Sequence, residues 1–286
     1  MKIFVLGGAS YDTIYHFSFL PEPKAQTLFP KKTIKTIGST GIGKSIPLSK
    51  LGFDVTFHAM IGDDFYGKEI ISAMKKNHID FIYDIDPKGT KTHTNLIDDL
   101  GQRISIFENG GTFEPHVDEA KILEAIKDAD IIVLSIINYT RRFIKDIKRL
   151  GKPIWVDIHD YDLKNPYYND YIDSADFLLM SLDQVEEISD FASLMVNQNK
   201  LFLTTNGNQG AKCYTKDHIY TQEAIKTKHI KDFNGAGDHF FSGFLYGYLK
   251  FKSIEKALTA GAYLATSSIE SDEISNDEIS ETWLLE

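Results

Sequence analysis

Short apolar runs that alternate with segments of helical spacing constrain the fold more than any other feature of this sequence. Six runs rich in β-branched residues have the length of buried strands: Ile3–Leu6, Val55–Ile61, Ile131–Ile136, Ile154–Ile158, Phe177–Met180 and Leu201–Thr204. Six segments place apolar residues three or four positions apart and predict helices: Ser45–Leu51, Tyr66–Lys76, Asp118–Ile126, Arg141–Leu150, Gly237–Leu249 and Ile254–Ser267. The alternation predicts an α/β fold, a three-layer sandwich with helices on both faces of a mainly parallel sheet.

The composition restricts the partners that such a chain can bind. Its 286 residues, 42% of them hydrophobic, are sufficient for one domain over residues 1–286 with a full core. Acidic side chains number 41 and basic ones 31, so the chain on balance repels nucleic acid and small solutes are the expected partners. Cys213 is the only cysteine, which excludes an internal disulfide and predicts a cytoplasmic location. The run Ile3–Leu6 is too short for a signal peptide, and no stretch approaches a membrane span.

Two segments interrupt the alternation of strands and helices. Residues 13–37 are rich in Phe, Pro, Thr and Lys without a helical period, and residues 90–107 alternate around Asp98–Gly101, which is typical of a hairpin turn. Segments this long inside a compact domain are more often functional than not, so we predict that they form a small β flap, or lid. Ordinary surface loops are the alternative. An exposed edge of the flap could pair with a second copy in a homodimer.

The most informative segment opens a predicted helix. Gly235, Ala236 and Gly237 are small, so they leave backbone N–H groups uncovered at the positive end of the helix, where an anion is stabilised. Asp238 follows directly and can take a proton from an attacking hydroxyl. The arrangement predicts an anion hole beside a general base.

The longer segment resembles the late signature of the ribokinase-like (PfkB) carbohydrate kinases, Asp-Thr-Thr-Gly-Ala-Gly-Asp-Ala-Phe followed by a small residue and Gly. The residues that match are Asp232, Gly235, Ala236, Gly237, Asp238, Phe240 and Gly243, and those that differ are Phe233, Asn234 and His239. The resemblance implies a ribokinase-like fold and phosphorylation of a sugar hydroxyl by ATP and Mg²⁺, with Asp238 as the catalytic base. It also implies a monovalent cation, K⁺, near Asp232.

Other segments match the same family in the expected order. Gly7–Asp12 resembles its opening strand and glycine turn, in which Asp12 accepts hydrogen bonds from sugar hydroxyls. The segment Gly62–Gly67 resembles a structural turn before a helix, and Gly101–Arg103 resembles the lid hairpin. Thr205–Gly210 resembles the family's Thr-x-Gly-x-x-Gly, which implies contacts of Thr205, Gly207 and Gly210 with ATP.

Two segments depart from the family pattern. The substrate-binding Gly-Gly-x-x-x-Asn corresponds to the segment that runs from Gly38 to Gly43, which assigns these two glycines to the acceptor pocket and removes an amide from it. The family's Asn-x-x-Glu, associated with Mg²⁺ and phosphate, falls on Ser181–Gln184 and so lacks its carboxylate. We expect Asp183 and Glu186, the nearest acids, to be solvated helix residues.

Gly38–Ser45 also fits the Walker A pattern, and Ile154–Asp157 could be a Walker B strand, so a P-loop NTPase is a rival hypothesis. A P-loop requires a core strand immediately before it, whereas Phe29–Ile37 alternates like a flap strand. We therefore favour the ribokinase-like mechanism, in which Lys44 is peripheral. A nucleoside kinase of the same fold is one further alternative, and a protein that binds a sugar or nucleoside without phosphorylating it is another.

Overall fold

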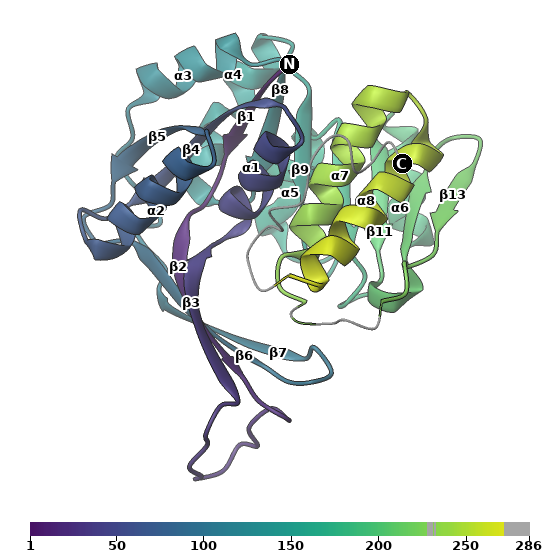
Figure 1. Cartoon of the computed structure of the whole chain (residues 1–286). Coiled ribbons are helices and arrows are strands. Elements are labelled where there is room, and N and C mark those ends of the chain that lie inside the picture. Colours follow the sequence, from purple (N-terminus) through teal and green to yellow (C-terminus); the bar gives the residue numbers. More distant parts are fainter. Residues whose placement is uncertain (228–230, 232, 272–286) are drawn as a thin grey trace.

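A nine-stranded sheet lies at the centre of the computed structural model, which describes residues 1–227, 231 and 233–271 (Figure 1). The strands lie in the order β13-β12-β11-β10-β9-β8-β1-β4-β5, parallel from β5 to β11 and antiparallel at β12 and β13. Their bounds are β1 (Lys2–Leu6), β4 (Asp54–Ile61), β5 (Asp80–Ile85), β8 (Ile131–Ser135), β9 (Ile154–Asp157), β10 (Phe177–Ser181), β11 (Leu201–Thr205), β12 (Ala211–Tyr214) and β13 (Ile219–Gln222). The mainly parallel sheet and all six predicted strands are confirmed.

Helices cover both faces of this sheet. One face packs against α1 (Thr40–Lys50), α2 (Phe65–Lys76), α7 (Ala236–Phe251) and α8 (Ile254–Ile269). The other packs against α3 (Glu119–Asp128), α4 (Ile144–Arg149), α5 (Asn169–Ser174) and α6 (Ser189–Asn197). Short 3₁₀ turns complete the set: η1 (Asn138–Phe143), η2 (Pro166–Tyr168) and η3 (Gly207–Gln209).

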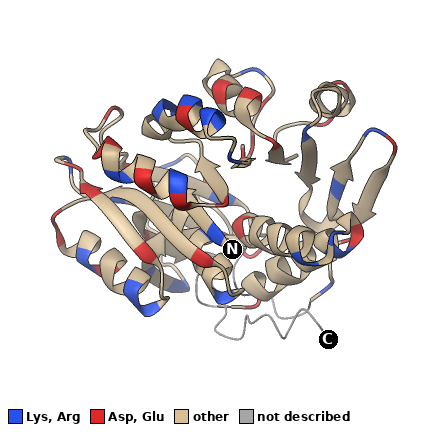
Figure 2. Cartoon of the chain, turned by 90° about the horizontal axis from the view of Figure 1, so that it is seen from above, with Lys and Arg blue, Asp and Glu red and all other residues tan. Residues whose placement is uncertain are grey.

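Strand β1 illustrates why the sequence produces three layers. Its buried side chains alternate, with Ile3 and Val5 in the core on the α7 side and Phe4 and Leu6 in the core on the α3 side. Because both faces are covered, every position from Ile3 to Leu6 is apolar, which produces the continuous run seen in the sequence. Charged residues of both signs are interspersed along the outer helices (Figure 2). The three-layer sandwich is confirmed.

Some helices differ from the sequence predictions. Helix α1 begins at Thr40 rather than Ser45, so Pro47 lies well inside the helix and not in its first turn. The segment predicted as the helix Arg141–Leu150 begins inside η1 and continues as α4. Helices α5 and α6 were not predicted, because they are short and each buries only a few side chains.

A separate four-stranded sheet forms the predicted lid. Its order is β3 (Lys32–Gly38), β2 (Ser10–His16), β6 (Lys91–Ile97) and β7 (Arg103–Asn109). The hairpin between β6 and β7 turns where expected, since one carboxylate oxygen of Asp98 accepts the N–H groups of Leu100 and Gln102, each at 2.9 Å. The flap is thus confirmed in preference to surface loops, although residues 17–31 between β2 and β3 form no helix or strand.

The β6–β7 hairpin projects from the lid toward the part of the molecule that holds α7 and α8 (Figure 1). A Cβ atom on Gly101 would come within 2.6 Å of the Phe233 ring, so the hairpin tip touches the chain just before α7. Arg103 also donates a hydrogen bond to the side chain of Asn234 at 3.3 Å. Phe233 and Asn234, two departures from the family signature, therefore contact the lid.

Cys213 has its side chain in the core and is fully buried on β12. Burial raises the pKa of its thiol to about 12, so it is a small buried hydrophobe as the sequence suggests. None of the helices in the described part of the chain is long and apolar enough to span a membrane.

Candidate active site

The first turn of α7 has the geometry of an anion site. Gly235 precedes the helix with φ of 83°, a left-handed conformation that favours glycine, and it brings no side chain to cap the helix. The N–H of Ala236 reaches only the carbonyl of Phe233, at 3.4 Å. A Cβ atom added to Gly237 would meet no atom of the described residues within 4 Å, so none of these residues fills the space beside this turn. These three residues can therefore receive a phosphoryl oxygen at the positive end of the helix.

The carboxylate of Asp238 lies beside this turn and is largely buried, with 13% of its side chain exposed. One oxygen accepts a short hydrogen bond from Nζ of Lys44. The other lies against Gly43, where any Cβ atom would overlap with it. Two consecutive residues of α1 thus fix the position of Asp238.

Lys44 corrects the prediction that it is peripheral. It is 2% exposed, and its Nζ also lies 3.0 Å from Oδ2 of Asp157 at the end of β9. The ammonium sits 5.1 Å from the centre of the Phe241 ring. A buried ammonium requires such partners, because leaving it unpaired in the core would be costly.

The charges around Lys44 support one another. Although burial by itself would raise the pKa of Asp157, His159 and Lys44 hold it below its ordinary value. Burial disfavours the charged lysine, but Asp157 and Asp238 together raise the pKa of Lys44 above its usual range. Lys44 is therefore an ammonium ion at neutral pH.

Asp12 forms a second carboxylate site on the lid strand β2. It is 4% exposed, and its Oδ1 accepts a hydrogen bond from Ser10 at 2.7 Å and lies 3.4 Å from Nδ1 of His93. Asp12 and His93 are paired across β2 and β6, and His93 packs against Phe107 of β7 with ring centres 4.1 Å apart. Polar groups from neighbouring lid strands thus surround this carboxyl group.

Burial raises the pKa of Asp12 to about 6, despite the hydrogen bond from Ser10 and the positive charge of Arg103, which both lower it. Burial and the charges of Lys91 and Arg103 lower the pKa of His93 to about 4. His93 is therefore neutral at pH 7 and adds no positive charge beside Asp12.

The two glycines predicted to bind substrate connect these carboxylates. A Cβ atom on Gly38 would overlap with Asp12, as one on Gly43 would overlap with Asp238. Gly38 ends β3, and Gly43 lies in the first turns of α1, so one short segment borders both acids. The glycines are needed because side chains there would occupy the space of the carboxylates.

The predicted ATP-binding turn follows β11. The carbonyl of Thr205 accepts the N–H of Leu182 at 2.9 Å, which joins this turn to the end of β10. Gly207 has φ of 47° and no atom within 4 Å of an added Cβ, so it borders open space. Gly210 has φ of 88°, and a Cβ there would overlap with the carbonyl of Gln222. Gly207 can approach a ligand, whereas Gly210 shapes the turn.

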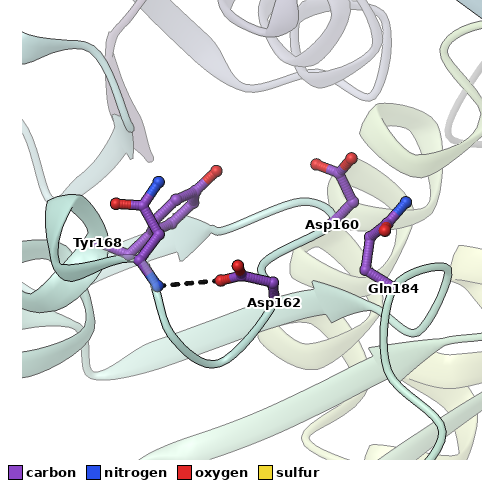
Figure 3. Close-up of a pocket in the computed structure, with 5 residues that line it drawn as sticks. Asp160, Asp162, Tyr168 and Gln184 are labelled. Atoms are coloured by element: carbon purple, nitrogen blue, oxygen red, sulfur yellow. Dashed lines mark hydrogen bonds between the residues drawn. The ribbon is translucent and has the colours of Figure 1, made fainter.

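A cavity of about 380 Å³ opens beyond β9 and β10 (Figure 3). Its lining residues are Asp160, Asp162, Asn165, Tyr168 and Gln184. Asp162 accepts the N–H of Asn165 at 3.0 Å. Gln184, which replaces the family glutamate, is the one residue of the predicted site segments that lines the cavity.

The described residues contain no group of three or more His, Cys, Asp or Glu side chains that could hold a metal ion. Asp183 and Glu186 are exposed in the turns between β10 and α6, and so are not helix residues as expected. The segment fits Mg²⁺ only as an ion that arrives with nucleotide phosphates. Asp232, the predicted contact of a monovalent cation, lies outside the described residues.

The P-loop hypothesis is wrong for this chain. The strand before Gly38 is β3, which belongs to the lid rather than to the main sheet. Lys44 points at two carboxylates, which leaves its ammonium unavailable for phosphates in this arrangement. Lys44 of the apparent Walker A motif instead forms ion pairs with Asp157 of the apparent Walker B strand and with Asp238.

Asp157 and His93 lie beside predicted site residues, but the sequence interpretation did not assign either of them to the ribokinase-like site. Asp157 ends a buried strand at the carboxyl edge of a parallel sheet, where ligands bind, and that position was the available signal. Lys44 carried a signal as well, because it stands among buried apolar residues of α1 and so needs an internal partner. His93 carried none, since only the strand pairing brings it to Asp12.

Comparisons with known proteins agree with this architecture. The model of the pfkB family carbohydrate kinases matches residues 11–280. Acarbose 7(IV)-phosphotransferase of Actinoplanes sp. is 25% identical over 275 residues, which cover 92% of each chain. The structure of a microbiome-derived acarbose kinase has a TM-score of 0.88 and 25% identity, over 99% of this chain and 97% of that one.

A structure of Arabidopsis thaliana ribokinase complexed with ribose and ATP has a TM-score of 0.81 and 22% identity, over 100% of this chain and 98% of that one. This likeness supports the fold. The order of the strands, the lid, the first turn of α7 and the family match lead to one assignment: the chain belongs to the pfkB family of carbohydrate kinases, with the ribokinase-like fold.

Proposed function

We propose that this kinase transfers the γ-phosphoryl group of ATP to a hydroxyl of a sugar or sugar-like acceptor, with Asp238 as the general base. The observation that carries the proposal is the juxtaposition of the Asp238 carboxylate with the open first turn of α7. A base and an anion hole on one helix turn are what phosphoryl transfer to a hydroxyl requires. The relatives named for acarbose support a sugar-like acceptor.

In this mechanism the acceptor lies between the lid and α7. Asp12 accepts hydrogen bonds from acceptor hydroxyls and orients one of them toward Asp238. As the new bond from the hydroxyl oxygen to phosphorus forms and the bond to ADP breaks, Asp238 takes the hydroxyl proton. The N–H groups of Gly235, Ala236 and Gly237 stabilise the negative charge on the transferring group.

The nucleotide would lie along the turn after β11, where Thr205, Gly207 and Gly210 form its border. Mg²⁺ supplies neutralising charge when bound, and it would be held mainly by the nucleotide because the chain has Gln184 in place of a carboxylate. A K⁺ ion near Asp232 is part of the proposal. The lid excludes water, which would otherwise compete as acceptor.

The proposal includes a homodimer formed through the lid. Strand β7 is an edge strand, and the side chains from Arg103 to Glu108 are all exposed, with Phe107 at 68%. An edge with unpaired backbone groups and apolar side chains favours pairing with another strand.

The test is ADP release over a panel of sugars, acarbose and nucleosides, with wild type and Asp238→Asn compared. Asn keeps the shape but accepts no full proton, so kcat should fall about 10²–10⁴-fold while ATP affinity stays nearly unchanged. Asp217→Asn is the matched control, because Asp217 is exposed in the turn between β12 and β13 and is not one of the residues of the candidate site. An Asp238→Asn variant with wild-type turnover would exclude Asp238 as the base.

If ATP binds and no acceptor of the panel yields ADP, the alternative of a sugar or nucleoside binder without kinase activity gains support. Preference for nucleosides in the same assay would favour the nucleoside kinase alternative.

A further inference from the structure

Lys44 contacts the proposed base and contributes nothing else to the mechanism above. Its ammonium lies between Asp238 on α7 and Asp157 on β9, with a short hydrogen bond to the first and a distance of 3.0 Å to the second. The lysine side chain is 2% exposed and that of Asp157 is 7% exposed. These three side chains come from three separate elements and are brought together only by the fold.

The charges facing Lys44 follow from the elements packed around it. They are Asp157 at the end of β9, His159 just after it, whose Nδ1 lies 3.4 Å from Oδ2 of Asp157, and Asp238 on α7. The ring of Phe241 covers the ammonium from the same helix. Among the described residues, Asp157, His159 and Asp238 are the charged or titratable groups whose contacts place them around the Lys44 ammonium.

The arrangement has a surplus of one negative charge when both aspartates are ionised. Once Asp238 takes a proton from the acceptor, Lys44 and Asp157 remain as a matched pair, so the proton transfer leaves no uncompensated buried charge. The ammonium of Lys44 is therefore shared between two carboxylates rather than paired with Asp238 alone.

The position of the carboxylate is fixed as well as its charge. Gly43 allows one oxygen of Asp238 to lie where any other residue would place its Cβ, and Lys44, the next residue, holds the second oxygen. The hydroxyl of Ser242 donates to the carbonyl oxygen of Asp238 at 2.8 Å and also lies 3.4 Å from the carbonyl oxygen of Lys44, so it brings this turn of α1 next to α7. The Gly43-Lys44 pair thus locates the base at the site where the family pattern has an amide.

We infer that Lys44 and Asp157 form a positioning pair for the catalytic base, in which Lys44 orients the Asp238 carboxylate and keeps it ionised while Asp157 preserves its strength as a base. This inference rests on the proposed role of Asp238.

The experiment compares kcat from pH 5 to 9, at saturating ATP and acceptor, for Lys44→Met and Asp157→Asn. In Lys44→Met, Asp238 loses its cation and faces Asp157, so the acid limb should move about 1–3 pH units upward, with kcat lowered most at pH 5 and largely recovered at pH 9. In Asp157→Asn, Asp238 is the one carboxylate left beside Lys44. The acid limb of the kcat profile should therefore not move upward, and the maximal kcat should fall about tenfold without recovery at high pH. ATP affinity should change less than about threefold in both.

Lys145→Met is the matched control, since Lys145 is exposed on α4 at the other face of the sheet. A uniform loss of kcat at every pH in both variants would overturn the inference and assign a structural role only. A large loss of ATP affinity in Lys44→Met would overturn it in favour of a phosphate contact. If Lys44→Met does not fold by circular dichroism, Asp157→Asn and the double variant carry the test, and the acid limb of the double variant should lie above that of Asp157→Asn. Wild-type turnover in Asp238→Asn would refute the proposed function itself, which separates the two failures.

Discussion

The carboxyl groups of Asp238 and Asp12 have different polar neighbours. Asp238 has the ammonium of Lys44 beside it, whereas Asp12 has Ser10 and an imidazole that is neutral at pH 7. Burial raises the pKa of Asp12 to about 6, because it outweighs the hydrogen bond from Ser10 and the charge of Arg103. Asp12 therefore changes its charge near pH 6.

This difference predicts a pH dependence of acceptor binding. A pKa raised to about 6 means that Asp12 is charged above pH 6 and neutral below it, so it loses hydrogen-bond acceptors as the pH falls through 6. We expect kcat/KM for the acceptor, at saturating ATP, to fall up to about tenfold per pH unit below that point. Rates from pH 5 to 8 measure it, and Asp12→Asn should show a lower kcat/KM without this step. An identical step in both proteins would assign it to another group.

Gly38 and Gly43 show why a residue's position in a motif does not determine its role. The family resemblance assigns both to the acceptor pocket, and they do border the two acids. Their contribution is space, because each lies where a side chain would collide with a carboxylate. A role of this kind becomes visible only once the neighbouring element is in place.

At the scale of elements, the lid hairpin and the start of α7 form a contact that can be broken selectively. Phe233 packs on Gly101 and Asn234 accepts from Arg103, so Phe233→Thr should loosen the closed lid. We expect the acceptor KM to rise and the share of ATP lost to water to increase several-fold, as in a deletion of residues 98–103. The ratio of ADP to phosphorylated acceptor measures this coupling. Phe29→Thr is the control, because Phe29 is 86% exposed in the loop between β2 and β3. An unchanged ratio in a folded Phe233→Thr variant would reduce the contact to surface packing.

Sequence reasoning predicted the strands and helices whose own residues show a clear apolar run or a clear apolar period. Strands such as β1 and β10 are buried on both faces and appear as continuous apolar runs. Strand β5 is at the edge of the sheet and alternates with exposed residues, and β12 and β13 are short, so they were not singled out. The contact of Lys44 with Asp157 joins residues more than a hundred positions apart, and no local pattern encodes it.

At the scale of the whole molecule, the lid edge predicts the oligomeric state. Pairing through β7 should give a particle of twice the chain mass of 32.4 kDa in analytical ultracentrifugation. Ile106, 47% exposed on β7, is a position where a lysine should prevent pairing, so Ile106→Lys should sediment as a monomer. The matched control is Ile219→Lys at β13, the edge of the main sheet, where Ile219 is 52% exposed. Dissociation by Ile219→Lys alone would place the interface on the main sheet instead.

Because Cys213 is the only cysteine and is buried, a cysteine introduced elsewhere can be labelled selectively. Its thiol is inaccessible and, with a pKa of about 12, almost wholly protonated at neutral pH, so maleimide reagents should leave the native protein unmodified. Leu100, 80% exposed at the tip of the β6–β7 hairpin, could then be replaced as Leu100→Cys to carry a single spectroscopic probe. The surroundings of the lid tip could be followed in solution during turnover, without first removing a native cysteine.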